Sequence, residues 1–395
     1  MLGVTGSIAC YKATDLASKL TQAGALVDVL LTPSALQFIT PLAFQSVSGW
    51  RAYSDADLWG SEGHVLHIGL ARGADLLLVA PATANTLAKL AHGVADNLLT
   101  LTALASSCPL LLAPAMDGGM FTHPATQANL EILRQRGAVV IGPAEGRLAS
   151  GQSGIGRMLE PLEILGHARY QLSRSGPLQG RRVVVTSGGT QEPLDPVRVL
   201  TNRSSGKQGF ALAQAALDLG AEVTLVAAPV SLPAPVGAQR VDVFTAEDML
   251  QAVLAAVPQA DALVMAAAVA DFRPVAPPSE KIKKEHGLPQ IRLEHTPDIL
   301  REVAQVKIST GWPRLTVGFA AESQDLLENA RRKLEAKKLD LLVANDITAQ
   351  DAGFAVDTNR VTLVYAGGRS QALPLMGKDE VARQVMKKVI ELLKI

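Results

Sequence analysis

The sequence has little net charge, little cysteine and few aromatic side chains. Lys and Arg together number 37 and Asp and Glu together number 37, so the formal charges cancel, and charged residues make up only 19% of the chain. This balance disfavours nucleic acid as the main ligand, because binding to a phosphate backbone depends on clustered positive charge. The two cysteines, Cys10 and Cys108, are too few for a disulfide framework or a four-ligand zinc site. We therefore expect a reducing compartment and no structural metal.

Membrane and secretion signals are also missing. The longest uncharged run, residues 97–116, has enough residues to cross a bilayer, but it includes Pro109 and Pro114, so we expect a buried helix followed by a strand. The N-terminal MLGVTGSIAC lacks the basic region and cleavage site of a secretory signal. We expect a cytoplasmic protein. Because LGV follows Met1 directly and an interior strand usually needs about five residues, we also expect the native start to lie upstream.

The alternation of apolar runs and helical patterns predicts the fold. A hydrophobic fraction of 48% with 4% aromatic residues is typical of Ala-, Val- and Leu-rich parallel α/β layers. Strand-length runs start at Leu26, Asp75, Pro109 and Ala138, falter between residues 171 and 180, and resume with RRVVVTSGGT. We predict two doubly wound parallel-sheet (Rossmann- or flavodoxin-like) domains, residues 1–172 and 181–395, joined by a linker over 173–180.

Both predicted domains open with a strand, a glycine-bearing turn and a helix. The strings are GVTGSIACYK in the first and VVVTSGG ahead of SSGKQGFALA in the second. Backbone N–H groups at such a turn can approach an anion, and the helix dipole adds attraction. Each turn is a candidate phosphate cradle, although neither fits GxGxxG, and a tight turn without a ligand is the alternative.

Two polar loops and one histidine stand out in the first domain. The loops are PATANT, residues 81–86, and PAMDGGM, residues 114–120, each following a predicted strand at the edge where doubly wound folds bind ligands. A capping asparagine in the first loop and a turn aspartate in the second are the alternative explanations. His67 lies on a short apolar helix before the strand at Asp75, where a packed core histidine is the alternative to a functional one.

Together these residues resemble a known family. The strings GVTGSIACYK, GHVLHIGLARGADLLLVAPATANTLAKLAHGVADNLL, PAMDGGM and GIGRM look like the flavin-dependent cysteine decarboxylases, and specifically the phosphopantothenoylcysteine decarboxylases. The resemblance implies an FMN enzyme whose sites lie between the subunits of a trimer, with His67 as catalytic base. It also implies transient oxidation of the cysteine by FMN, so that carbon dioxide leaves without net redox change. The FMN contacts that it implies are Gly6, Ser7, Thr32, Pro81, Thr83, Asn85, Thr86 and Met116.

Two further catalytic positions depart from that family's usual pattern. Asp117 stands where Asn is usual, and an ionised carboxylate only accepts hydrogen bonds. Ser150 stands where many members carry a cysteine that supplies a proton, and a hydroxyl is a far weaker acid. A water or a neighbouring side chain is the alternative proton source.

The second domain begins with a long, turn-rich segment that predicts an anion-binding loop. It offers backbone N–H groups at Gly188, Gly189 and Gly206. Further on, Lys333 and Lys337 are four residues apart on one predicted helix face, where an anion would relieve their repulsion. A solvated basic helix is the alternative. We expect Asp271 and Phe319 to end their strands at the ligand-binding edge.

The second domain also resembles a known family. The strings DPVRVLTNRSSGKQGFALA, AAAVADFRP, EKIKK, TPDIL, VGFAAES and LLVAND look like the phosphopantothenate-cysteine ligases. The resemblance implies Mg²⁺-assisted activation of a carboxylate by CTP, with Asn202 and Arg198 facing the acyl-cytidylate. The CTP contacts that it implies are Asp271, Lys281, Pro297, Asp298, Ile299, Leu300, Phe319, Lys333 and Lys337. No metal ligand is identified.

The whole chain therefore resembles the bifunctional coenzyme A biosynthesis proteins. That resemblance implies CTP-dependent ligation of 4'-phosphopantothenate with L-cysteine, then FMN-dependent decarboxylation to 4'-phosphopantetheine. It also implies a homo-oligomer with trimeric decarboxylase cores and dimeric ligase contacts, and no nucleic-acid or membrane partner. One alternative is an FMN-binding regulatory module fused to an active ligase. Another is a pair of nucleotide-binding oxidoreductase domains, which the absence of GxGxxG disfavours.

Overall fold

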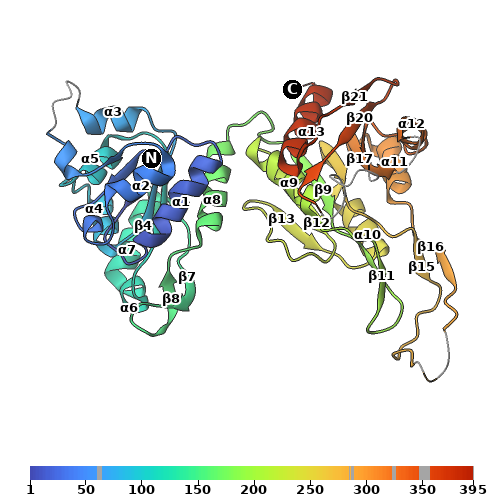
Figure 1. Ribbon diagram of the computed structural model, residues 1–395, viewed down its shortest axis with the longest axis horizontal. Coiled ribbons are helices and arrows are strands. Elements are labelled where there is room, and N and C mark those ends of the chain that lie inside the picture. Colours follow the sequence, from blue (N-terminus) through green and yellow to red (C-terminus); the bar gives the residue numbers. More distant parts are fainter. Residues whose placement is uncertain (60–64, 284, 286–288, 323–325, 347–355, 395) are drawn as a thin grey trace. The chain divides into compact units, whose positions relative to one another are not determined.

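The computed structural model describes residues 1–394 except 60–64, 284, 286–288, 323–325 and 347–355. The chain divides into two compact units, Met1–Leu172 and Ser173–Ile395 (Figure 1). Residues 173–180, predicted as a linker, lie with the second unit, where Leu178 is fully buried in a core cluster and its N–H donates to the carbonyl of Leu219.

The first unit contains a six-stranded parallel sheet in the order β3-β2-β1-β4-β5-β6. This is the strand order of a doubly wound dinucleotide-binding fold. The unit's elements are β1 (Leu2–Val4), α1 (Cys10–Gln22), β2 (Val29–Leu31), α2 (Pro41–Ser48), β3 (Ala52–Tyr53), α3 (Leu66–Arg72), β4 (Leu77–Ala82), α4 (Ala84–His92), α5 (Leu98–Ala105), β5 (Leu110–Pro114), α6 (Gly118–Thr122), α7 (Pro124–Gln135), β6 (Val139–Val140), β7 (Ala144–Arg147), β8 (Ser153–Arg157) and α8 (Pro161–Ser173).

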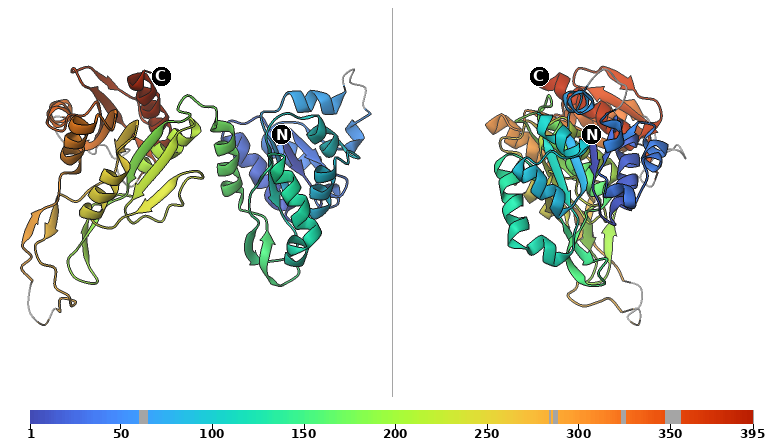
Figure 2. Two further views of the ribbon diagram at one scale, coloured as in Figure 1. Left: turned by 180° about the vertical axis from the view of Figure 1, so that it is seen from behind. Right: turned by 90° about the vertical axis from the view of Figure 1, so that its left-hand side faces the viewer.

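Helices cover both faces of this sheet (Figures 1 and 2). Alternate residues of a strand point to opposite faces, so Leu111 packs with α1, α2 and α8 while Leu112 packs with α4, α5 and α7. The predicted helix and strand within residues 97–116 are confirmed as α5 and β5. Among the helices of the described part of the chain, none combines the length and apolar character that a membrane crossing needs.

The second unit repeats the same strand order and then extends it. Its sheet runs β13-β12-β9-β14-β17-β18-β20-β21, with β20 and β21 antiparallel at one edge. The elements are β9 (Arg182–Ser187), β10 (Gln191–Pro193), β11 (Val199–Thr201), α9 (Lys207–Asp218), β12 (Glu222–Ala227), β13 (Gln239–Asp242), α10 (Ala246–Ala256), β14 (Ala262–Met265), β15 (Phe272–Pro274), β16 (Leu293–His295), α11 (Ile299–Thr310), β17 (Leu315–Glu322), α12 (Leu326–Ala336), β18 (Leu341–Asp346), β19 (Thr358–Asn359), β20 (Val361–Tyr365), β21 (Ser370–Ala372), β22 (Met376–Gly377) and α13 (Lys378–Leu393).

Two predicted strand ends in the second unit are wrong. β14 ends at Met265, and the chain then leaves the sheet through residues 266–270 before it reaches Asp271. β17 continues to Glu322, so Phe319 lies inside the strand. Runs of alanine and valine look the same in a strand as in a loop that packs on a sheet edge, which is why the apolar pattern gave the wrong limits. The β15–β16 ribbon, which follows this loop, extends away from the sheet (Figure 1).

Candidate active sites

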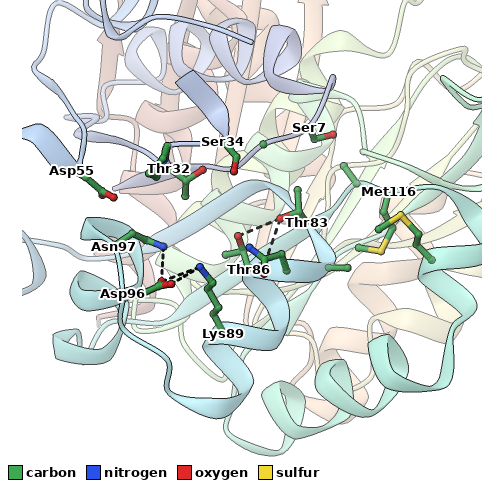
Figure 3. A pocket seen from close by; sticks show the side chains of 16 residues that line it. Ser7, Thr32, Ser34, Asp55, Thr83, Thr86, Lys89, Asp96, Asn97 and Met116 are labelled. Atoms are coloured by element: carbon green, nitrogen blue, oxygen red, sulfur yellow. Dashed lines mark hydrogen bonds and ion pairs between the residues drawn. The ribbon is translucent and has the colours of Figure 1, made fainter. Parts of the chain in front are cut away.

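The first unit has a pocket of about 500 Å³ at the carboxyl ends of β1 and β4, where the strand order reverses (Figure 3). Doubly wound folds bind their ligands at this position. Gly6 forms part of the wall, and a Cβ built there would lie 2.4 Å from the Cβ of Ser34, so a larger residue would push the two loops apart. The lining residues are Gly6, Ser7, Thr32, Pro33, Ser34, Asp55, Thr83, Ala84, Asn85, Thr86, Lys89, Asp96, Asn97, Ala115, Met116 and Met120.

Threonine hydroxyls form one wall of this pocket. Thr5 Oγ1 donates to the Pro81 carbonyl at 2.7 Å and accepts from the Thr83 N–H at 3.0 Å. Thr83 is the N-cap of α4, and its Oγ1 accepts from the Thr86 N–H at 3.4 Å. The helix cap of this loop is therefore Thr83, and the alternative of a capping asparagine is wrong because Asn85 lies inside α4. Thr83 and Asn85 both line the pocket.

The basic residue of the pocket is already paired. Lys89 Nζ contacts the two carboxylate oxygens of Asp96 at 2.9 and 2.7 Å, and Asn97 Nδ2 donates to Asp96 as well. The hydrogen bond from Lys89 lowers the pKa of the Asp96 carboxyl, so this acid stays ionised near neutral pH. These three residues gather at one side of the pocket, away from Met116 (Figure 3). Asp55 also lines the pocket, and its Oδ1 accepts from the Leu98 N–H at 2.9 Å, so the lining is polar and carries no net positive charge.

Most of the expected FMN contacts meet in this pocket. Pro81 does not line it; it follows a cis peptide bond and lies buried behind the wall. Ser34 and Asp55 also line it and lie outside every motif quoted above, whereas Lys89, Asp96 and Asn97 line it from within the string of residues 63–99 without having been singled out. The expected contacts that do line the pocket are Gly6, Ser7, Thr32, Thr83, Asn85, Thr86 and Met116.

Asp117 and Ser150, the two atypical positions, are hydrogen-bonded to each other. Ser150 Oγ donates to Asp117 Oδ2 at 2.8 Å, and Asp117 Oδ1 accepts from the Gly119 N–H at 3.0 Å as the N-cap of α6. The bond from Ser150, followed by the bond from Gly119, lowers the pKa of Asp117. An ionised acid with a serine on one oxygen therefore stands where the resemblance predicted an amide.

The β7–β8 hairpin brings Ser150 to this position. Its turn carries Ser150, and the Met116 N–H donates to the Gly156 carbonyl of β8 at 3.0 Å. A Cβ on Gly156 would lie 2.2 Å from the Met116 carbonyl oxygen, so close docking of the hairpin requires glycine there. Neither Asp117 nor Ser150 is among the residues that line the pocket.

His67 lies on the predicted short helix, α3, and its side chain is half-buried. α3 packs against α5, and the neighbouring Leu66 contacts the apolar cluster on that face of the sheet. His67 does not line the pocket either. One copy of the chain therefore does not bring the expected base together with the pocket.

The second unit has a larger pocket, of about 770 Å³, at the carboxyl ends of β14, β17 and β18. Much of its wall comes from the loop into α9, the loop that follows β14, and the start of α11. Asn202 Nδ2 donates to the carbonyls of Ala268 and Val269 at 3.2 and 3.1 Å, which joins the first two segments. The expected site residues that line it are Asn202, Asp271, Pro297, Asp298, Ile299, Leu300, Phe319, Lys333 and Lys337.

The two lysines expected on one helix face differ in their surroundings. Lys333 lies in α12, and Lys337 follows the end of that helix, where its N–H still donates to the Lys333 carbonyl. Lys337 Nζ forms an ion pair with Asp298. The expected repulsion between the two ammonium groups is thus relieved in part by a carboxylate of the protein.

Arg198 and Lys281 do not line this pocket. Arg198 forms an ion pair with Asp195 at 3.2 Å, and its Nη2 donates to the Ile282 carbonyl at 3.3 Å. Burial raises the pKa of Asp195, but its hydrogen bonds and a nearby positive charge have the larger combined effect, so the pKa is lowered. The hydrogen bonds come from the N–H groups of Val197, Arg198 and Ile282, and the charge is that of Arg198. Asp195 therefore holds the loop of Arg198 and the segment of Lys281 together, at a distance from the pocket lining.

Several polar residues of the second pocket have no expected role. Lys207, Asn345, Asn359 and Lys378 all line it. Asn345 belongs to the LLVAND string, but Asn359 and Lys378 come from a region where the sequence showed no motif. Within the described ranges, no group of three or more His, Cys, Asp or Glu side chains is placed to hold a metal ion.

Comparison with known proteins gives a match for each unit. Residues 1–170 match the family model described as flavoprotein, and residues 178–393 match the model described as DNA/pantothenate metabolism flavoprotein C-terminal domain. The coenzyme A biosynthesis bifunctional protein CoaBC of Bacillus subtilis is 46% identical over 100% of this chain and 97% of its own length. Those of Mycobacterium bovis and Escherichia coli are 44% and 42% identical, over 100% and 99% of this chain and 96% of each relative.

Solved structures match each unit separately. The crystal structure of the C-terminal domain of a CoaBC protein is 39% identical, with a TM-score of 0.47, over 56% of this chain and 99% of that domain. The FMN binding protein AtHal3 is 39% identical, with a TM-score of 0.39, over 42% of this chain and 92% of that protein.

Proposed function

The chain belongs to the family of coenzyme A biosynthesis bifunctional proteins, and from this premise we propose how its two units divide the chemistry. It is an enzyme of coenzyme A biosynthesis with a decarboxylase and a ligase activity. We assign phosphopantothenoylcysteine decarboxylation to residues 1–172, CTP-dependent phosphopantothenate-cysteine ligation to residues 181–395, and the connection to residues 173–180. The order of the units along the chain is opposite to the order of the reactions.

The first pocket fits FMN. Its volume of about 500 Å³ is in the range of small-molecule sites, and its hydroxyl-lined wall can bond a heterocycle without burying a charge. The turn from β1 into α1 carries Gly6 and Ser7, which line the pocket, and the positive end of the α1 dipole there favours the phosphate of the cofactor. Bound there, FMN would supply reversible two-electron chemistry at the cysteine carbon.

The chain's own residues bind and orient the substrate beside this pocket. We propose that His67 acts as the base and reaches the pocket from a neighbouring subunit, since it does not line the pocket of its own copy. Asp117 and Ser150 lie on the loop next to Met116 and on the docked hairpin. Ser150 Oγ donates a hydrogen bond to the Asp117 carboxylate. We therefore propose that a water oriented by these two side chains supplies the proton, and that Ser150 itself does not.

The second pocket fits a nucleoside triphosphate. Phe319 packs against the apolar core from β17 and can hold the base or ribose. Lys333 and Lys337 supply positive charge, and Mg²⁺ would shield the triphosphate when bound. We propose that the remaining CTP contacts are Asp271, Pro297, Asp298, Ile299 and Leu300, which line the pocket. Lys281 lies outside the lining on an exposed segment, and its proposed contact with CTP requires that segment to approach the bound nucleotide.

Ligation then proceeds in two balanced steps. The pantothenate carboxylate oxygen attacks the α-phosphorus of CTP, and pyrophosphate leaves. The cysteine nitrogen next attacks the acyl carbonyl, loses a proton, and CMP leaves. Asn202 and Arg198 would hold the acyl intermediate. Cationic side chains accelerate the first step because negative charge develops on the departing pyrophosphate.

The observation that carries this proposal is the presence of two pockets of different character, one neutral and one rich in lysine, on two sheets of the same strand order. A coupled assay tests it. Purified protein should be yellow and should convert phosphopantothenate, cysteine and CTP into pyrophosphate and phosphopantetheine. Bound flavin without release of carbon dioxide would instead favour the regulatory-module alternative. We also propose that the protein is a cytoplasmic homo-oligomer. Sedimentation analysis of the purified protein would test the oligomeric state, and cell fractionation would test the location.

A further inference from the structure

One buried lysine attaches the base of the β7–β8 hairpin to α1. Lys12 lies in the first turn of α1 and is 6% exposed. Its Nζ donates to Glu160 Oε1 at 2.8 Å and to the Met158 carbonyl at 3.3 Å. Both partners lie in the short segment between β8 and α8. Lys12 therefore joins the helix to the point where the hairpin ends.

The burial of this lysine needs an explanation. An ammonium group is costly to bury, and an apolar side chain of similar size is often at least as stable in its place. The carboxylate of Glu160 is 57% exposed and is shared with Arg157 at 2.7 Å, so water competes for it. Stability alone therefore does not account for Lys12, whereas a fixed position of the segment after β8 does.

The helix that carries Lys12 also forms part of the first pocket. The turn before α1 carries Gly6 and Ser7, which line the pocket. On the other side, Met158 is 1% exposed and belongs to the same core cluster as Cys10 and Ala13 of α1. α1 thus contacts the base of the hairpin through apolar packing and through Lys12, and the pocket through the turn that precedes it.

The remaining contacts of the hairpin are weaker. Its two strands form a sheet of their own, and a ribbon of two strands is only marginally stable in water. The bond from Ser150 to Asp117 at its turn is exposed, and the Met116 N–H donates a single bond to the Gly156 carbonyl. The place that the turn takes up therefore depends on where the base is held.

We propose that Lys12 is a positioning residue for decarboxylation, which fixes the base of the β7–β8 hairpin so that Ser150 reaches Asp117. Lys12 does not line the first pocket, so it acts through the hairpin and not on the substrate. The inference rests on the proposed decarboxylase function and deepens it.

Two measurements on the full-length, flavin-loaded protein test this role. Trypsin cleavage after Arg147, which is exposed at the end of β7, reports how often the hairpin opens, and mass spectrometry identifies the cleaved bond. Steady-state release of carbon dioxide gives kcat and KM. The variants are Lys12→Met and the conservative Lys12→Arg. Lys19→Met is the matched control, because Lys19 also lies on α1 but pairs with Asp15 of the same helix.

Lys12→Met should speed cleavage after Arg147 about 10- to 100-fold, because loss of a hydrogen bond to a charged group raises the population of the open hairpin. The kcat of decarboxylation should fall at least about 10-fold and KM should change less than about threefold, since small misplacements near the reacting groups slow chemistry. Lys12→Arg should recover most of both effects. Lys19→Met should change either by less than about twofold, and ligation should not change in any variant.

A second substitution separates positioning from a general structural role. Ser150→Ala removes the contact that Lys12 is proposed to position. In that background, Lys12→Met should lower kcat by less than about a further threefold, because the two changes act on one contact and are not additive. An equal loss of kcat in both backgrounds would overturn the proposal.

Unchanged cleavage in Lys12→Met would also overturn it, as would faster cleavage with an unchanged kcat. Faster cleavage throughout the first unit would show a general loss of structure and count against positioning. Should Lys12→Met not fold, Glu160→Gln decides, since it weakens the same attachment at a largely exposed side chain. Absence of carbon dioxide release from the wild type would instead contradict the proposed function, and the cleavage rates would still show whether Lys12 holds the hairpin.

Discussion

The two units share the arrangement of six parallel strands but differ in what lines the carboxyl edge of each sheet. In the first unit the edge carries hydroxyls and one lysine that Asp96 neutralises. In the second it carries Lys207, Lys333, Lys337 and Lys378. A common strand order therefore places a site at the same edge twice, and the loops after each strand decide which ligand the site suits.

The second difference lies in the sheet edge beyond the six shared strands. The first sheet ends at β6, whereas the second continues with the antiparallel strands β20 and β21 and then α13. The short strand β19 delivers Asn359 to the pocket, and the start of α13 delivers Lys378. Lys378, which lies 170 residues after Gln208, thus contributes charge next to the first turn of α9.

Removal of a single lysine should separate the two activities most strongly. We expect Lys281→Gln to reduce ligation at least about 100-fold, since loss of one contact to developing charge typically costs roughly 3 kcal/mol of barrier. Decarboxylation of supplied phosphopantothenoylcysteine should not change. Initial rates of pyrophosphate and carbon dioxide release measure the two activities. Lys283→Gln, on the same exposed segment, is the control, and equal loss of both activities would contradict the assignment.

Matched core substitutions should show whether the units unfold separately. Leu111 and Leu341 are both 0% exposed, each on a central strand of its own sheet. Replacing either by Ala should cost about 3 kcal/mol through lost burial and the cavity left behind. In calorimetry, Leu111→Ala should lower the unfolding temperature of the first unit, and the variant should also retain less flavin. Leu341→Ala should lower the unfolding temperature of the second unit alone. A common shift of both transitions would show that the units unfold together.

The sequence predicted the parts of this comparison that depend on local pattern. The strands from Leu26, Asp75 and Pro109 are present because each apolar run is buried by helices on both faces. Motif resemblance selected nine residues that line the second pocket: Asn202, Asp271, Pro297, Asp298, Ile299, Leu300, Phe319, Lys333 and Lys337.

Contacts between distant segments were not predictable in this way. Asp117 and Ser150 were each singled out, but their hydrogen bond depends on how the β7–β8 hairpin docks on Met116, which no local pattern encodes. Lys378 is an ordinary helix-starting lysine in the sequence. Its burial depends on the packing of α13 against α9, which brings two distant helix starts together.

The charge of Asp117 should distinguish the first unit from its relatives. We expect Asp117→Asn to lower the KM for phosphopantothenoylcysteine about fivefold, because it removes a negative charge where the substrate carboxylate is expected and like charges repel each other even in water. Ligation should not change. Steady-state decarboxylation kinetics measure the effect. Asp15→Asn, on the exposed face of α1, is the control, and a raised KM for Asp117→Asn would contradict the expected carboxylate position.

The smallest expected effect concerns Asp195, which organises the second unit's loops without lining its pocket. In Asp195→Asn, an amide N–H would replace the oxygen that accepts from the Ile282 N–H, so the segment of Lys281 would be released from the loop of Arg198. We expect ligation to fall about threefold and decarboxylation to stay constant, with the exposed Asp242→Asn as control.

The pH dependence sharpens this last prediction. The folded structure lowers the pKa of Asp195. The stability that the ionised Asp195 contributes is therefore complete above the pKa of an ordinary aspartate, about 3.9. It is lost only as the pH falls through the lower pKa of the folded state. The ratio of wild-type to Asp195→Asn ligation rates should therefore be constant between pH 6 and 8. A ratio that changes across that range would show that another group holds the loops together.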